Sequence, residues 1–145
     1  MKEVLEIKKL DERAKVPTYG TEYSAGADLY ALLDSNIEIK PGETKMISTG
    51  LAMAIPTGYV GLIYARSSLG TKKGLAPANK VGVIDSDYRG EVKVCLYNHS
   101  EEIQTIEPYD RIAQIVFTPY LQVKFSEVSE LDETIRGDGG FGSTN

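Results

Sequence analysis

The chain has 145 residues, 41% hydrophobic and 26% charged, which predicts one soluble globular domain with a real core. The net charge of −5 argues against binding to a nucleic-acid polymer, because such binding normally needs a basic face. No apolar run approaches the roughly 18 residues of a membrane span, and the first residues carry no signal-peptide pattern, so we expect no membrane association.

Cysteine and histidine are almost absent. The single cysteine, Cys95, excludes an internal disulfide and is typical of a reducing compartment, so we expect a cytoplasmic protein, with a nuclear location left open for a eukaryotic source. The single histidine, His99, leaves little scope for a histidine-based triad or a zinc site. Chemistry in this chain should therefore rest on carboxylates, arginines and hydroxyls.

Short segments of alternating polarity, separated by proline and glycine, predict an all-β fold, a distorted jelly roll or β-sandwich with one short helix. We expect a compact domain over residues 1–128 and an acidic, glycine-rich tail over residues 129–145. The predicted strands, in chain order, cover residues 36–40, 45–55, 60–64, 91–96, 112–117 and 122–126.

Residues 25–31 are the first segment with more detail than folding requires. Small residues there let the backbone pass close to a neighbour, and they hold Asp28 between apolar side chains. An aspartate that merely caps or turns the chain is the alternative.

Residues 64–70 follow a strand of the buried type. Arg66 and two serines stand where the short helix begins, near Ser67 or Ser68. A helix N-terminus, a guanidinium and hydroxyls together favour phosphate binding. Ser67 as a plain helix cap is the alternative, and the two interpretations are compatible.

Residues 79–90 predict a β-hairpin that turns between Ser86 and Gly90. Asp85 should lie partly shielded at the end of a strand, where a carboxylate can hold water or accept its proton. Tyr88 offers a flat wall for a sugar, and the hairpin backbone could read a pyrimidine edge. An aspartate-rich turn without function is the alternative.

Residues 108–115 predict a turn followed by a buried strand that carries Gln114 inward. A buried amide must be hydrogen-bonded, so Gln114 is either a structural linker or a ligand contact, and the sequence leaves both open.

The last ten residues, 136–145, place Phe141 among four glycines, after Arg136 and before two hydroxyls. Glycine loses much backbone entropy on ordering, so this segment cannot build a core. It does carry the groups that clamp a planar, anionic ligand, namely a flat ring, a guanidinium and hydroxyls. A frayed polar terminus is the alternative.

Taken together and in order, these five segments resemble the five motifs of the trimeric dUTP diphosphatases (dUTPases), from Ala25 to Thr144. The combination of residues 82–90 with residues 136–144 is the most specific part. The resemblance implies a jelly-roll homotrimer with active sites shared between subunits and closed by the tails. It implies Mg²⁺-dependent hydrolysis of dUTP to dUMP and pyrophosphate. That activity would limit uracil incorporation into DNA and supply dUMP for dTMP synthesis.

The resemblance also assigns roles to the nucleoside end of the site. Asp85 would orient and deprotonate the water that attacks the α-phosphorus, and Tyr88 would pack under the deoxyribose and exclude a 2′-hydroxyl. The residues that would read uracil are Asn79, Val83, Ile84 and Lys93.

The resemblance assigns the phosphates to four further residues, Arg66, Ser67, Ser68 and Gln114. Asp28 would position Mg²⁺ through water, because in this family the substrate phosphates mainly carry the metal.

In the tail, the resemblance implies that Arg136, Ser143 and Thr144 bind the terminal phosphate while Phe141 stacks on the base. Gly142 belongs to the same set of substrate-binding residues.

Three positions depart from the usual family pattern. Ser68 and Tyr109 stand where glycine is common, and Asn145 ends the chain where glycine is usual. None of the three removes a catalytic group.

Two rival functions fit the same motifs less well. A dCTP deaminase would need a glutamate at the position that Cys95 occupies here. A purely regulatory module on this fold would be free to lose Asp85 or the tail, and both are present.

Overall fold

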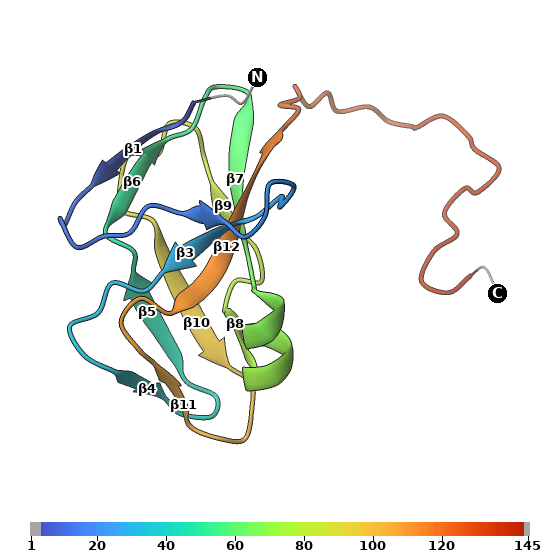
Figure 1. Cartoon of the computed structure of the whole chain (residues 1–145). Coiled ribbons are helices and arrows are strands. Elements are labelled where there is room, and N and C mark those ends of the chain that lie inside the picture. The colour runs from blue at the N-terminus through green and yellow to red at the C-terminus, as the bar shows by residue number, and fades with distance from the viewer. Residues whose placement is uncertain (1–3, 144–145) are drawn as a thin grey trace.

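The computed structural model describes residues 4–143, and within that range it is almost entirely β (Figure 1). The expected all-β, jelly-roll-like architecture with one short helix is confirmed. The strands are β1 (Glu6–Lys9), β2 (Thr18–Tyr19), β3 (Ala27–Tyr30), β4 (Ile37–Ile39), β5 (Thr44–Ser48), β6 (Leu51–Ala54), β7 (Tyr59–Tyr64), β8 (Leu75–Pro77), β9 (Gly82–Ile84), β10 (Lys93–Asn98), β11 (Gln104–Ile106) and β12 (Arg111–Pro119).

The largest sheet has the order β2-β3-β12-β7-β9. Its centre pairs β12 with β7 antiparallel, with Gln114 opposite Tyr64. On its other side β12 pairs with β3, with Gln114 opposite Asp28. The predicted strands at residues 60–64 and 112–117 are therefore neighbours. Gln114 lies between β3, which carries Asp28, and β7, which leads to Arg66.

Three smaller sheets complete the body: β5-β10-β8, β1-β6 and β11-β4. Aliphatic side chains from these sheets and from the large sheet meet in one core. The largest fully buried ones are Leu29, Ile39, Ile47, Leu51, Leu75, Val92, Val94, Leu96, Ile106, Ile112 and Ile115. The alternation over residues 45–55 predicted one strand, but the chain forms two, β5 and β6, with a break at Thr49 and Gly50.

The helix η1 (Ser68–Lys73) is a single π-helical turn that follows β7. Ser67 precedes it with helical dihedral angles, φ −55° and ψ −43°, and its side chain makes no capping hydrogen bond. The interpretation of Ser67 as a plain cap is therefore wrong, because a capping serine needs an extended backbone that turns its hydroxyl toward the helix. Leu69 is buried and anchors the turn to the core.

The predicted hairpin over residues 79–96 is wrong. A turn does form, with the Tyr88 amide donating to the Asp85 carbonyl at 3.1 Å. The flanking strands nevertheless join different sheets, because β9 pairs with β7 while β10 pairs with β5 and β8. The segment is thus a bridge between two sheets.

The predicted strand at residues 122–126 is also wrong for this chain. The strand β12 ends at Pro119, and the following residues lie in no strand. Leu121, Val123 and Phe125 are exposed, so their alternating pattern has no partner strand within residues 4–143. The chain then leads away from the body (Figure 1). No helix among the described residues is long and apolar enough to cross a membrane.

Candidate functional site

Asp28 lies at the centre of one group of predicted site residues. The residue is only 8% exposed, and it lies on β3, whose four residues are all buried. The Nε of Arg66 donates to its Oδ1 at 2.7 Å, and the Nη1 of Arg111 donates to its Oδ2 at 3.4 Å. We call Asp28, Arg66, Ser68, Arg111 and Gln114 the Asp28 cluster. The alternative of a turn or capping aspartate is wrong, since Asp28 is a strand residue with two arginine partners.

Arg66 is held in this cluster on both sides of its guanidinium. Besides Asp28, its Nη1 donates to the Ser68 hydroxyl at 3.2 Å, and its side chain is 20% exposed. Ser67 is exposed next to it. Arg66, Ser67 and Ser68 therefore stand together, as predicted, where β7 gives way to η1.

Gln114 joins the cluster as a structural linker, since its amide donates to the Ala65 carbonyl at 2.9 Å. Gly26 makes this geometry possible, because a Cβ at that position would overlap the Gln114 side chain. The amide of Gln114 therefore fixes the backbone immediately before Arg66. Its half-buried position leaves the second interpretation, a ligand contact, open as a prediction.

A second group surrounds Tyr88. A hollow of about 460 Å³ is lined by residues from β5, β9, β10 and the turn between β9 and β10. We call it the Tyr88 hollow, and its lining residues are Met46, Val83, Ile84, Asp85, Tyr88, Glu91 and Lys93. Five of these were predicted from the sequence. Met46 and Glu91 were missed, since neither an exposed methionine nor a strand-end glutamate signals a site.

Tyr88 is fixed by backbone groups. Its hydroxyl donates to the Glu91 carbonyl at 2.8 Å, and a Cβ at Gly90 would collide with the ring. The carboxylate of Glu91 accepts the Gly50 amide at 2.9 Å and lies 3.5 Å from Lys93 Nζ. The ring is thereby held as a wall of the hollow, with one face toward solvent.

Asp85 follows β9, as predicted, but it is exposed and not partly shielded. Asn79 is exposed as well, with its amide beside Gly82 at the start of β9. Within one chain the Tyr88 hollow is therefore open to water at Asp85 and Asn79.

The two groups lie at opposite ends of the β7–β9 pair. Gly82 stands opposite Ile63, and Ile84 stands opposite Gly61. Asp85 therefore lies beside the start of β7, while Arg66 lies beyond its end. Tyr64 is three positions after Gly61, which is about 10 Å along a strand, and Arg66 lies two positions further on. One chain does not bring the two groups into one pocket.

The tail residues lie apart from both groups (Figure 1). The hydrogen bonds that the structure gives residues 134–143 are local, such as Arg136 Nε to the Gly139 carbonyl at 2.9 Å. Phe141 is fully exposed, and Gly142 and Ser143 are exposed beside it. Thr144, the remaining predicted tail contact, lies outside the described residues.

The described residues hold no group of three or more His, Cys, Asp or Glu side chains that could bind a metal. Asp28 is the predicted metal contact, and its two oxygens already accept from arginines. A carboxylate has further lone pairs for water, so this chemistry fits a cation held elsewhere and met through water.

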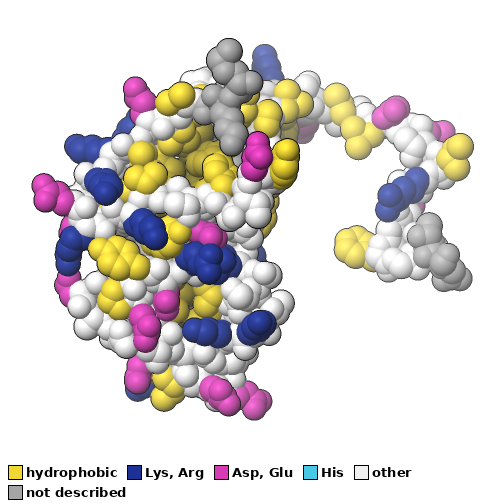
Figure 2. Space-filling model, in the orientation of Figure 1, with side chains coloured by type: hydrophobic (Ala, Val, Ile, Leu, Met, Phe, Trp, Pro, Cys, Tyr) yellow, Lys and Arg dark blue, Asp and Glu magenta, His cyan; other side chains and the backbone are white. Residues whose placement is uncertain are grey.

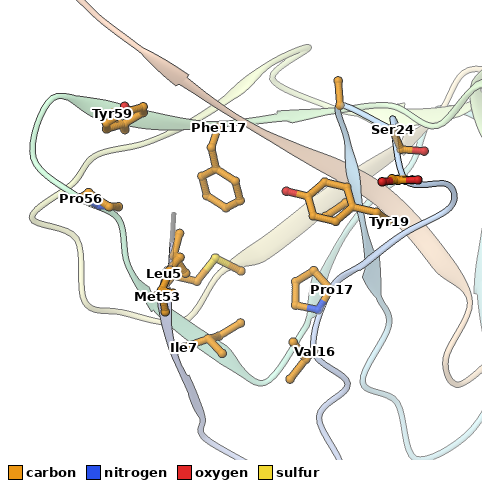
Figure 3. Close-up of a pocket in the computed structure, with 14 residues that line it drawn as sticks. Leu5, Ile7, Val16, Pro17, Tyr19, Ser24, Met53, Pro56, Tyr59 and Phe117 are labelled. Carbon is orange, nitrogen blue, oxygen red and sulfur yellow. The ribbon is translucent and has the colours of Figure 1, made fainter. Parts of the chain in front are cut away.

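An apolar hollow of about 640 Å³ contains no predicted site residue. In Figure 3 the rings of Tyr19 and Phe117 point into it, opposite Leu5, which precedes β1, and opposite Ile7 of β1 and Met53 of β6. Figure 2 shows the hydrophobic floor of this hollow exposed beside the polar surface of the body.

Comparison with known proteins agrees with this geometry. The dUTPase family model matches residues 12–145. The deoxyuridine 5′-triphosphate nucleotidohydrolase of Nautilia profundicola is 51% identical over 140 residues, with 97% of each chain covered. That of Neisseria meningitidis serogroup A is 48% identical over 143 residues, which cover 97% of this chain and 95% of that protein.

Two phage proteins represent the solved structures that this fold resembles. A mutant dUTPase of Staphylococcus bacteriophage 80alpha with dUpNHpp has a TM-score of 0.86 and 27% identity, over 98% of both chains. A mutant dUTPase from phage phi11 of S. aureus, described with a structural Mg(II) ion, has a TM-score of 0.78 and 26% identity. The match covers 88% of this chain and 98% of that one.

Proposed function

Because the chain belongs to the dUTPase family of hydrolases, we propose that it cleaves dUTP to dUMP and pyrophosphate by attack of water on the α-phosphorus. The observation that carries the proposal is the conjunction of two groups in one fold, one built to hold phosphate and one built to hold a nucleoside. We further propose that this activity limits uracil in DNA and supplies dUMP.

The Asp28 cluster is the phosphate end of the proposed site. Arg66 is oriented by Asp28 and Ser68, so its guanidinium is arranged before any ligand arrives. Ser67, Ser68 and Gln114 add polar groups around it. Phosphoryl transfer needs positioning and neutralised charge more than covalent chemistry, which suits a chain with one histidine and one cysteine.

The Tyr88 hollow is the proposed nucleoside end. Tyr88 offers its ring face to the deoxyribose, and a 2′-hydroxyl would collide with that wall. The exposed backbone of Val83 and Ile84, with Asn79 and Lys93, would read the uracil edge through hydrogen bonds. Asp85, at the rim, would take the proton of the attacking water while its oxygen bonds to the α-phosphorus and the bond to the pyrophosphate oxygen breaks.

We propose a homotrimer in which each site combines the phosphate end of one subunit with the nucleoside end of another. Two observations support this assembly. The two ends lie at opposite ends of the β7–β9 pair within one chain. The apolar hollow of Figure 3 and the exposed Leu121, Val123 and Phe125 also leave surface that a second copy would cover.

Mg²⁺, when bound with the substrate, would neutralise phosphate charge and orient the triphosphate for in-line attack. Asp28 would hold water molecules of that cation, in keeping with the absence of a three-ligand site among the described residues. The protein's own contribution to charge neutralisation would be Arg66 and the tail arginine Arg136.

We propose that residues 129–145 form a flexible tail that closes over the occupied site. Phe141 would stack on the base, and Arg136, Ser143 and Thr144 would hold the terminal phosphate, with Gly142 between them. Its exposure and its purely local hydrogen bonds support a segment that orders on binding.

Pyrophosphate release from dUTP, dCTP, dTTP and UTP tests this function directly. We expect turnover of dUTP with Mg²⁺, little with the other three nucleotides, and a loss of about a thousandfold in kcat for Asp85→Asn. Ammonia release from dCTP would instead reveal a deaminase. Undiminished turnover by Asp85→Asn would overturn the proposed mechanism.

A further inference from the structure

We propose that Arg111 is a positioning residue for Arg66, acting through Asp28. The inference rests on the proposed function, since it concerns the phosphate end of that site. Arg111 holds Oδ2 of Asp28 while Arg66 holds Oδ1, so the buried carboxylate is fixed between two guanidinium groups.

A β-bulge in β12 is the first observation behind this role. Gln114 lies opposite Asp28 and Ala113 opposite Leu29, so an unbroken ladder would place Ile112 opposite Tyr30. Arg111 occupies that place instead, because the register shifts between Arg111 and Ala113.

The consequence of the shift is a change of face. Side chains alternate across a strand, so Arg111 would otherwise point away from the face that carries Gln114. The bulge brings Arg111 to that face, beside Asp28, and leaves Ile112 and Ala113 both in the core. Bulges commonly re-aim a side chain beside an active site.

The burial of Asp28 is the second observation. A carboxylate that is nearly enclosed must be paired and hydrogen-bonded, and Arg66 alone engages only one of its oxygens. Because Arg111 donates to Oδ2, the plane of the Asp28 carboxylate is fixed. The direction in which Oδ1 accepts the hydrogen bond from Arg66 Nε is then fixed as well. The guanidinium of Arg66 is then aimed before the triphosphate arrives.

The exposure of the two arginines differs in the way this role requires. The Arg66 side chain is 20% exposed, whereas that of Arg111 is 52% exposed. Arg66 is thus the inner, constrained group, and Arg111 is the outer group that fixes the Asp28 carboxylate. The shorter contact, 2.7 Å against 3.4 Å, belongs to the constrained arginine.

A double-mutant cycle on the full-length protein tests the proposal, with Arg111→Gln, Asp28→Asn and both together. We expect Arg111→Gln to lower kcat for dUTP about tenfold with KM nearly unchanged, and Asp28→Asn to lower kcat about a hundredfold. The double variant should have the same kcat as Asp28→Asn alone, because Arg111 acts only through the Asp28 carboxylate, which that substitution removes. Arg111→Lys, which keeps one donor and the charge, should recover most of the loss.

The matched control is Arg13→Gln, which removes the same charge from the exposed contacts of Arg13 with Asp11 and Asp34 and should leave kcat and KM unchanged. Additive effects of Arg111→Gln and Asp28→Asn on kcat, or a change in KM alone, would show direct phosphate binding by Arg111 and overturn the proposal. Wild-type values of kcat and KM for Arg111→Gln would also overturn the proposal, because they would show that Arg111 has no effect on the reaction.

Thermal unfolding of the same variants separates this proposal from the proposed function. Coupling between Arg111 and Asp28 should also make their effects on Tm non-additive, whatever the substrate proves to be. Absence of dUTP turnover in the wild-type protein would refute the proposed function, whereas additive shifts in Tm would refute the positioning role of Arg111.

Discussion

Two arginines predicted to bind phosphate stand in opposite structural states. Arg66 is constrained by Asp28 and Ser68 at the edge of the core, with its backbone position fixed through Gln114 and Ala65. The Arg136 side chain donates to the Gly139 carbonyl of its own segment, in a tail that extends from the body. The sequence shows the same residue type in both places, but the structure gives only the first a fixed orientation.

The difference separates two ways of supplying charge to a ligand. A constrained guanidinium has its entropy removed during folding, so its full interaction is available to the transition state. A tail arginine must be ordered at the moment of binding, which costs part of its interaction energy but leaves the site open for entry and release. Changes in the body should therefore reduce both stability and activity, while changes in the tail should reduce activity alone.

Truncation after Ile135 should give the largest effect. It removes Arg136, Phe141 and Ser143 together, so we expect kcat/KM for dUTP to fall about a thousandfold. The Tm should stay within about 1 °C of the full-length value, since these residues bury almost no surface on the body. Kinetics and differential scanning calorimetry on the same preparation measure both. Undiminished turnover would mean that the tail closes nothing.

The pair Arg66→Gln and Arg136→Gln compares the two arginines directly. We expect each to lower kcat/KM about a hundredfold, since each removes a charged contact to phosphate. Only Arg66→Gln should also lower the Tm, by about 5 °C, because it leaves Asp28 nearly enclosed with Arg111 alone. Equal Tm values for the two variants would show that Arg66 contributes no more to stability than Arg136 does.

Gly26→Ala tests whether the body positions Gln114. A methyl group at residue 26 would displace the Gln114 amide from the Ala65 carbonyl. We expect a loss of about tenfold in kcat/KM and about 1–2 kcal/mol in unfolding free energy, as for other overpacked sites. Gly140→Ala is the matched control in the tail, where a Cβ would meet nothing. Wild-type kinetics for Gly26→Ala would show that Gln114 needs no fixed position.

Asp11→Asn should give the smallest effect, because Asp11 pairs with Arg13 at the surface. Hydrogen bonds from Arg13 lower the pKa of Asp11 from 3.8 to about 2. A lowered folded-state pKa stabilises the folded protein above pH 3.8, and that contribution is lost as the pH falls toward 2. The Tm difference between Asp11→Asn and wild type should therefore be small at pH 7 and disappear near pH 2. A pH-independent difference would exclude this explanation.

Sequence patterns predicted most of the strands, because alternation and apolar runs report on local burial. They also placed Arg66, Asp85 and Tyr88 beside the elements that carry them, whereas no strand was predicted for Asp28. The hairpin prediction failed because the choice of partner strand is not local: β9 finds β7 and β10 finds β5, although only a short turn separates β9 from β10. Alternation at residues 122–126 likewise indicates a segment that can form a strand, but it does not identify a partner strand.

Arg111 was missed for a related reason. Counting along an ideal strand places it on the opposite face from Gln114, and only the bulge brings it to Asp28. Tyr109 shows the reverse case. Tyr109 stands where glycine is common in the family pattern, and the structure has it at φ +65°, the left-handed region that favours glycine. Its hydroxyl donates to the Arg13 carbonyl, so the side chain adds a link to the N-terminal segment.

The antiparallel register of β7 and β9 has a consequence for genetics. If every site takes its phosphate end from one subunit and its nucleoside end from another, two inactive alleles can complement each other. Refolding an Arg66→Gln chain with an Asp85→Asn chain in equal amounts would give intact sites in about a quarter of positions, counted over all trimers formed by random assortment. Each inactive chain would thus carry the half that the other lacks.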